Sequence, residues 1–139
     1  MSVLGTPVNF DATPTQALTW TLETGSTGVI IEVGHEQTNG TRQIGSLSLG
    51  AVSATRKGYK VHGSGTTYAY VEVWYIVASL NTIGTNPTIT VTAASGGTTE
   101  YSGTIYCVDA IDTTPANWTE ANDGKSTDTA MQLTLSTLS

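Results

Sequence analysis

The chain has 139 residues, of which 27 are threonine, 15 are glycine and only 12% are charged. This length fits one domain that can bury a core without disulfides or a metal. A formal net charge of −6, with only five Lys and Arg residues, provides no basic surface for phosphates, so nucleic acid is not expected as a partner. Because threonine suits a pleated surface and strong helix formers are scarce, the composition predicts an all-β protein.

The amino-terminal sequence has no basic and apolar signal-peptide pattern, and no stretch has the length of a membrane helix. We therefore expect a protein that is made and kept in the cytoplasm, or that leaves it without such a signal, with no membrane partner. Cys107 is the only cysteine, so no internal disulfide forms, and its apolar surroundings predict a small buried side chain.

The first third of the chain begins with a Pro- and Thr-containing segment. Residues 1–16 are predicted to form an extended arm or an edge strand, and residues 17–139 a single domain. Asn39-Gly40 is a favoured hairpin turn pair. Apolar patterns between turn-rich segments predict strands at Ala17–Leu22, Gly28–His35 and Gln43–Ala54.

The middle of the chain contains the most apolar strand pattern. A short strand is expected at Tyr59–Val61 and a flexible loop at His62–Thr67. The strand Tyr68–Ala78 then reads YAYVEVWYIVA, which is apolar on both faces except at Glu72. A strand with one solvated face should alternate apolar and polar residues, so something must cover its second face. The candidate covers are a second layer of this chain, a neighbouring subunit or a flat ligand such as a sugar. We expect the other sheet of the sandwich on one face, and on the face of Tyr70, Glu72 and Trp74 either the amino-terminal arm or a neighbouring subunit, ahead of a sugar.

In the last third of the chain, apolar and polar residues alternate more regularly. The threonines at positions 88, 90 and 92 should face solvent, opposite Ile89 and Val91. The irregular stretch 109–129 exceeds usual connection lengths and is a candidate location for a site or contact. Strands are predicted at Pro87–Ala94, Gly103–Ala110 and Ala130–Leu138. About eight strands without a substantial helix predict an antiparallel β-sandwich or jelly roll.

Four residues are candidates for an interface or a ligand site: Tyr70, Glu72, Trp74 and Trp118. Trp118 lies in the long loop, where it can plug the sandwich end, bind a sugar face or anchor a subunit contact. Glu72 can bind a carbohydrate, or it can be a buried or interfacial acid held by an Arg or a hydroxyl group, since an unpaired buried carboxylate is costly.

Catalytic and metal motifs are weak. His35 and His62 have no neighbouring nucleophile elbow, zinc pair or phosphate loop, so no catalytic residue, cofactor or enzymatic activity is predicted. The oxygen-rich late loop contains weak calcium candidates, but their spacing matches no calcium loop, and no metal site is assigned. These candidates are Asp109, Asp112, Asp123 and Asp128.

The segments 71–93 and 102–118 resemble an all-β domain found in bacteriophage structural genes and in some large surface proteins. In that domain a strand ending in Glu-x-Trp-Tyr is followed by a Gly- and Asn-containing turn, a Thr/Val strand and an Asp and Thr-Pro loop. Residues 46–58 resemble its upstream strand, turn and Arg pattern, and this resemblance implies Arg56 as the partner of Glu72. The matching positions are Glu72, Trp74, Tyr75, Gly84, Asn86, Thr88, Thr90, Val91, Thr92, Asp109, Thr114 and Pro115.

The resemblance implies a non-enzymatic structural protein of a bacteriophage particle, assembled in the host cytoplasm. The first hypothesis is a capsid decoration or cement protein that contacts the major capsid protein and copies of itself, as a trimer. One alternative is a glycan-binding module of a fibre or adhesin, with Tyr70, Trp74 or Trp118 as a stacking platform. Another is a subunit of a non-viral extracellular filament built by strand donation.

Overall fold

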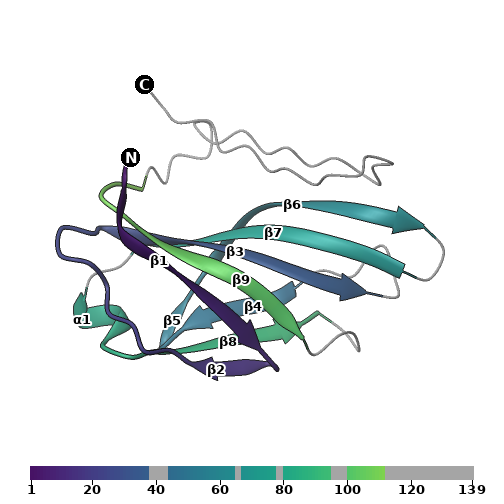
Figure 1. Ribbon diagram of the computed structural model, residues 1–139, viewed down its shortest axis with the longest axis horizontal. Helices are drawn as coiled ribbons and strands as arrows, with labels where there is room; N and C mark the ends of the chain where they lie inside the picture. The colour runs from purple at the N-terminus through teal and green to yellow at the C-terminus, as the bar shows by residue number, and fades with distance from the viewer. Residues whose placement is uncertain (38–43, 65–66, 78–79, 95–99, 112–139) are drawn as a thin grey trace.

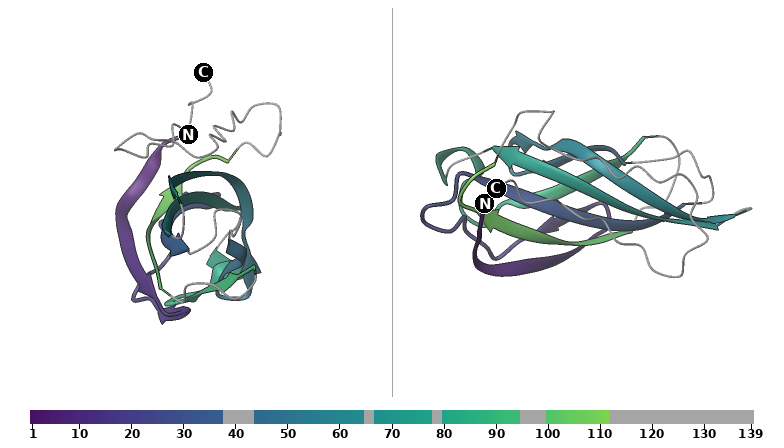
Figure 2. Two further views of the ribbon diagram at one scale, coloured as in Figure 1. Left: turned by 90° about the vertical axis from the view of Figure 1, so that its right-hand side faces the viewer. Right: turned by 90° about the horizontal axis from the view of Figure 1, so that it is seen from above.

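The computed structural model describes residues 1–37, 44–64, 67–77, 80–94 and 100–111, which form a β-sandwich of two antiparallel sheets (Figures 1 and 2). The five-stranded sheet has the order β1 (Val3–Ala12), β9 (Tyr101–Val108), β3 (Gly28–Gln37), β7 (Thr67–Val77) and β6 (Thr55–Ser64). The four-stranded sheet has the order β2 (Thr15–Ala17), β8 (Thr88–Ala93), β4 (Ile44–Leu49) and β5 (Val52–Ser53). The single helix among the described residues is the four-residue α1 (Leu80–Ile83).

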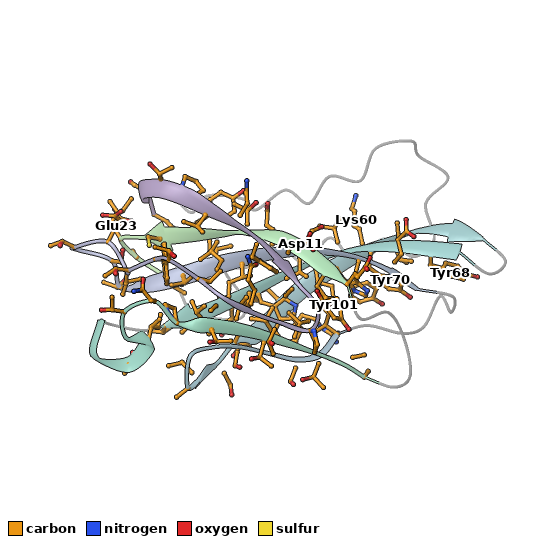
Figure 3. All side chains as sticks on the ribbon, turned by 60° about the horizontal axis from the view of Figure 1, so that its bottom comes forward. Asp11, Glu23, Lys60, Tyr68, Tyr70 and Tyr101 are labelled. Carbon is orange, nitrogen blue, oxygen red and sulfur yellow. The ribbon has the colours of Figure 1, made fainter. Side chains whose placement is uncertain are left out.

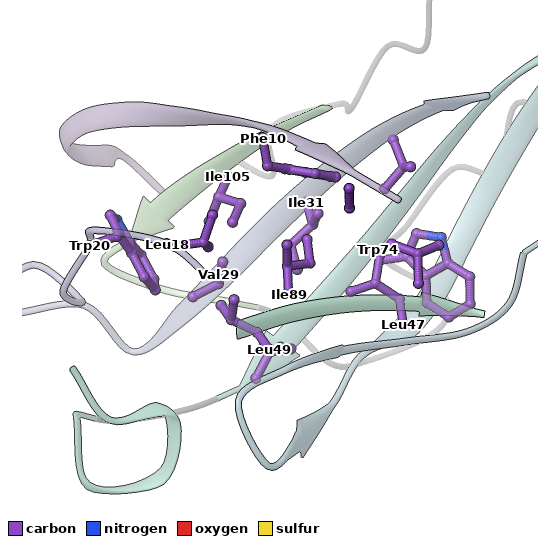
Figure 4. Packing of buried hydrophobic residues seen from close by; sticks show 14 of the residues in the cluster. Phe10, Leu18, Trp20, Val29, Ile31, Leu47, Leu49, Trp74, Ile89 and Ile105 are labelled. Atoms are coloured by element: carbon purple, nitrogen blue, oxygen red, sulfur yellow. The ribbon is translucent and has the colours of Figure 1, made fainter. Parts of the chain in front are cut away.

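The core lies between the two sheets and contains the apolar positions of both (Figure 4). On β8, Ile89 and Val91 are buried, whereas Thr88 and Thr92 are exposed and Thr90 is half-buried. The predicted solvent-facing threonines are therefore confirmed. The buried position of Cys107 is also confirmed. Its sulfur accepts a hydrogen bond from the backbone N–H of Glu23 at 3.5 Å.

The amino-terminal segment takes the second of its two predicted forms, an edge strand. β1 pairs with β9 of the same chain, from Val3 opposite Val108 to Ala12 opposite Tyr101. The register shifts between Leu4 and Val8, where Gly5 has a positive φ and Pro7 has no N–H to donate. β2 follows β1 closely in sequence but belongs to the other sheet, so the amino-terminal segment joins the two sheets.

Three predicted elements were wrong in their extent. Of the predicted strand at 17–22, only Ala17 is in a strand, at the end of β2. The residues after it form hydrogen bonds with the turn before β8 instead. The Leu18 N–H donates to Pro87 O, and the Asn86 N–H donates to Trp20 O. The predicted strand at 43–54 breaks at Gly50, whose φ is 60°. The predicted short strand at 59–61 is the ten-residue β6, so the expected loop at 62–67 contains the ends of β6 and β7.

Two further predictions concern pairing or residues outside the described ranges. β3 and β4 belong to different sheets, so they do not form the hairpin that Asn39-Gly40 suggested, and residues 39 and 40 are themselves outside the described residues. The predicted strand at 130–138 also lies outside them.

We expect Leu47→Ala to lower the free energy of unfolding by about 2–5 kcal/mol, because Leu47 is fully buried between the sheets and the truncation leaves a cavity. Urea unfolding followed by tryptophan fluorescence measures this. Thr92→Ala, on the solvent face of the neighbouring strand, is the matched control and should change stability by less than about 0.5 kcal/mol. Equal effects of the two substitutions would contradict the assignment of the two faces.

Candidate functional site

A buried carboxylate lies at the centre of the main polar cluster in the described residues. Glu72, on the inner face of β7, is 0% exposed. Its Oε1 accepts a hydrogen bond from the backbone N–H of Ile44 at 2.7 Å and lies 3.0 Å from Nε2 of His35. Ile44 begins β4, so this one oxygen connects the five-stranded sheet to the four-stranded sheet.

Arg56 provides the positive charge nearest to the second oxygen of Glu72. Its Nη1 lies 3.6 Å from Oε2, within ion-pair distance but beyond a hydrogen bond, so the predicted Arg56–Glu72 pair is confirmed. Within the described residues, Oε2 has no hydrogen-bond partner. The guanidinium group also lies 5.9 Å from the ring centre of Trp74 and 5.7 Å from that of Tyr59, in cation–π geometry.

Aromatic rings enclose the His35 side of Glu72. His35 is opposite Tyr70 in the β3–β7 register, and their rings stack at 4.9 Å with an interplanar angle of 9°. Tyr101 of β9 contacts the same histidine ring at 5.6 Å (Figure 3 labels Tyr70 and Tyr101). Burial, and secondarily the negative charge of Glu72, raises the pKa of the Tyr101 hydroxyl. We call Glu72, His35, Arg56, Tyr70 and Tyr101 the Glu72 cluster.

The positions of Tyr70, Glu72 and Trp74 correct the prediction that they form an interface or ligand surface. Tyr70 is 1% exposed and Trp74 is 5% exposed. Trp74 belongs to the main core between the sheets, so the second layer of this chain covers it, and not the amino-terminal arm or the neighbouring subunit that we expected. A sugar ring or a neighbouring subunit cannot reach these side chains while the sandwich is closed. Trp118 lies outside the described residues.

Asp109, the one calcium candidate that the structure describes, is engaged with the amino terminus. Its Oδ1 accepts a hydrogen bond from the backbone N–H of Ser2 at 2.6 Å, and its own N–H donates to Ser2 O at 3.2 Å. The hydrogen bond from Ser2 lowers the pKa of the Asp109 carboxyl, helped by the charge of the terminal amino group. Over the described ranges, no group of three or more His, Cys, Asp and Glu side chains is placed to hold a metal ion. Asp112, Asp123 and Asp128 lie outside these ranges.

The outer face of the five-stranded sheet is the part of the molecule that sequence reasoning did not identify. Strand registers divide it into two ends. At one end, Val3, Val108, Gly28 and Val77 form a row across four strands, and Tyr106, Ile30 and Tyr75 form the next row. We call these two rows the apolar end.

The apolar end is partly buried and partly open. Ile30, Val73 and Val108 are buried together, with Tyr106 and Ile111 packed against them. Val3 and Val77, at the two sides of the first row, are 54% and 56% exposed. The ammonium group of Lys57 lies 5.8 Å from the ring centre of Tyr75. Val3 and Val77 are exposed apolar side chains at opposite sides of this end, and side chains of this kind can contribute to a contact surface.

The other half, which we call the polar end, is hollow and acidic. Asp11, Ser102, Gly34 and Val71 form a row across four strands, and Gly34 leaves the centre of this row without a side chain. Two adjacent hollows of about 420 and 490 Å³ meet there. Their lining includes four carboxylates, from Asp11, Glu32, Glu36 and Glu100. Glu32 also accepts a hydrogen bond from the Tyr106 hydroxyl at 3.1 Å, and burial, followed by the Glu32 charge, raises the pKa of Tyr106.

Comparisons with known proteins indicate no function, so the features described above are the main evidence. No family model matches the chain, and searches of curated proteins and of solved structures also found no match. In the part of the chain that the structure describes, no helix has both the length and the apolar character that a membrane span needs.

Arg56→Ala should lower the free energy of unfolding by about 1–2 kcal/mol, because it leaves the buried Glu72 carboxylate without its nearest cation. The expected loss is smaller than for a fully buried pair, because Arg56 is 35% exposed and water can partly replace it. Thermal unfolding measures the effect. Arg56→Lys, which keeps the charge, is the control and should lose less. An unchanged melting temperature in Arg56→Ala would count against the ion pair.

Asp109→Asn should lower the melting temperature at neutral pH and have less effect in acid. A carboxyl whose pKa is lowered by folding stabilises the folded state above its unfolded pKa, and this stabilisation is lost as the pH falls through the folded value. The gap between wild type and Asp109→Asn should therefore close below the usual carboxyl range. Thermal unfolding over a pH series measures it, and a gap that is the same in acid as at neutral pH would refute the explanation.

Proposed function

We propose that the chain is a non-enzymatic structural protein of a bacteriophage particle, a capsid decoration protein that stabilises the head through its contacts with the major capsid protein. The observation that carries the proposal is the apolar end, where Val3 and Val77 are exposed on either side of a buried apolar cluster. We infer a bacteriophage particle from the sequence resemblance. The strand that contains Glu72–Tyr75 and the segments after it resemble domains found in phage structural genes.

The outer face of the five-stranded sheet limits the size of such a contact. Strands of ten or eleven residues extend roughly 35 Å, and five strands side by side span roughly 20 Å. The whole face covers roughly 700 Å², so a contact limited to the apolar end buries less than the roughly 800 Å² of each partner in a standard protein interface and belongs to the class of small interfaces. The outer face of the four-stranded sheet is much smaller, because β2 has three residues and β5 has two.

The Glu72 cluster supports a structural role for its polar groups. Glu72 and His35 have no exposed side-chain surface, so neither can meet a substrate in the closed sandwich. What they do contact is protein: a backbone N–H of the opposite sheet and aromatic rings of β7 and β9. Their chemistry is therefore that of a buried network that fixes the packing of the sheets.

The two alternatives have less support. The glycan-binding hypothesis required exposed aromatic platforms, and burial removes Tyr70 and Trp74 from that role. The filament hypothesis required a sheet edge open to strand addition. On the β1 edge, Pro7 has no N–H, and the N–H of Asp11 donates to the side chain of Gln16 at 2.6 Å. Proline, a register shift and a side-chain cap are typical protections of an edge against strand addition.

The first step of the test is to identify the protein that the adjacent gene encodes. If that gene encodes a major capsid protein, co-expressed particles separated on a density gradient should carry the wild-type chain. Val77→Asp should be lost from the particles, because it places a charge in the apolar contact, while its melting temperature stays close to wild type.

Thr92→Asp, on the outer face of the four-stranded sheet, is the matched control and should remain bound. Retention of Val77→Asp at the wild-type level would show that the apolar end is not the contact. Particles that carry no wild-type chain would refute the decoration role itself.

A further inference from the structure

Two polar atoms from neighbouring inner positions of β7 have no hydrogen-bond partner in the part of the chain that the structure describes. They are Oε2 of Glu72, which is an acceptor, and Nε1 of Trp74, which is a donor. Both side chains are buried, at 0% and 5% exposure. A buried polar atom without a partner is costly, and the large majority of such atoms in folded proteins bond to protein or to ordered water.

We propose that Glu72 and Trp74 form a binding site for one water molecule, which accepts a hydrogen bond from the Trp74 indole and donates one to Oε2 of Glu72. The two side chains lie two residues apart on the same face of β7, so one small molecule can reach both. They do not bond to each other, and each needs what water supplies, an acceptor for the indole and a donor for the carboxylate. This site does not depend on the proposed function.

Arg56 provides the third polar group of the site. It is opposite Trp74 in the β6–β7 register, and its guanidinium group lies 5.9 Å from the centre of the Trp74 ring. Its Nη1 is 3.6 Å from Oε2 of Glu72, too far for a direct hydrogen bond. A water molecule that also accepts a hydrogen bond from Nη1 has three polar partners, which is typical of buried water in proteins.

The charges of these groups select a neutral ligand. A metal cation would be repelled by the guanidinium group and would meet an indole N–H that cannot coordinate it, whereas an anion would be repelled by the carboxylate. Water carries no charge and both donates and accepts hydrogen bonds. Because the Arg56 side chain is 35% exposed, solvent reaches this side of Glu72, while the buried rings of Tyr70 and Trp74 exclude bulk water.

A crystal structure of the whole chain, at a resolution that shows ordered water, tests the site. We expect a water oxygen at about 2.7–3.2 Å from both Oε2 of Glu72 and Nε1 of Trp74. Trp74→Phe removes the N–H but keeps an aromatic ring, and it should lose this water. Trp20→Phe, at the opposite end of the same core, is the matched control and should retain it (Figure 4). A direct bond from Trp74 to Glu72, no water at this position, or a water that Trp74→Phe leaves unchanged would overturn the proposal.

A measurement on the unmodified chain in solution covers the case in which Trp74→Phe fails to fold. The chain has three tryptophans, so labelling the indole nitrogens gives three N–H signals in the NMR spectrum, which sequential assignment distinguishes. The indole proton of Trp74 should show magnetisation transfer to water with the sign expected of a bound water that tumbles with the protein. No transfer, or the sign of proton exchange or of freely diffusing water, would refute the site.

Discussion

The hydrogen bond from Ile44 to the carboxylate of Glu72 is the one polar contact on which the arrangement of the sandwich depends most. The core residues described between the sheets contribute apolar packing, which is not directional. A buried carboxylate is different, because it is stable only where its donors are correctly placed. Glu72 therefore fixes the start of β4 relative to β7, in the way that single buried polar groups fix register in other folds.

The same constraint explains the aromatic content of β7. A carboxylate can be buried only if water is kept out, and the rings of Tyr70 and Trp74 on either side of Glu72 along the inner face of β7 do this. The stacked His35 ring closes the side toward β3, and Arg56 closes the side toward β6. The segment is apolar on both faces because its inner face excludes water from Glu72, while its outer face includes the buried Val73.

Local sequence patterns predicted most of the fold, and they failed where partners distant in sequence decide the structure. The alternation at Thr88–Ala93 and the apolar run of β7 predicted their strands. The Arg56–Glu72 pair came from the family resemblance and not from a local pattern, and the structure contains it. Residues 18–22 have the same apolar alternation as a strand, but bond to the turn at Asn86 and Pro87 instead.

The faces of β7 could not be assigned from its own sequence, because both are apolar and only the opposite sheet distinguishes them. His35 and Tyr101 were missed as members of the Glu72 cluster for a related reason. They lie 37 and 29 residues from Glu72, on β3 and β9, and nothing in their own segments indicates that these strands bring them to the same carboxylate.

The two outer faces show how a chain with so little charge remains solvated. On the four-stranded sheet, Thr15, Thr90, Ser48 and Ser53 form a row of hydroxyl groups across all four strands. Threonine satisfies two demands there at once, because its branched side chain favours the extended backbone and its hydroxyl group bonds to water. On the five-stranded sheet, the carboxylates are gathered at the polar end and the exposed valines at the apolar end. Charge repulsion between like acidic surfaces would then disfavour contact through the polar end, so any partner with a negative surface is directed to the apolar end.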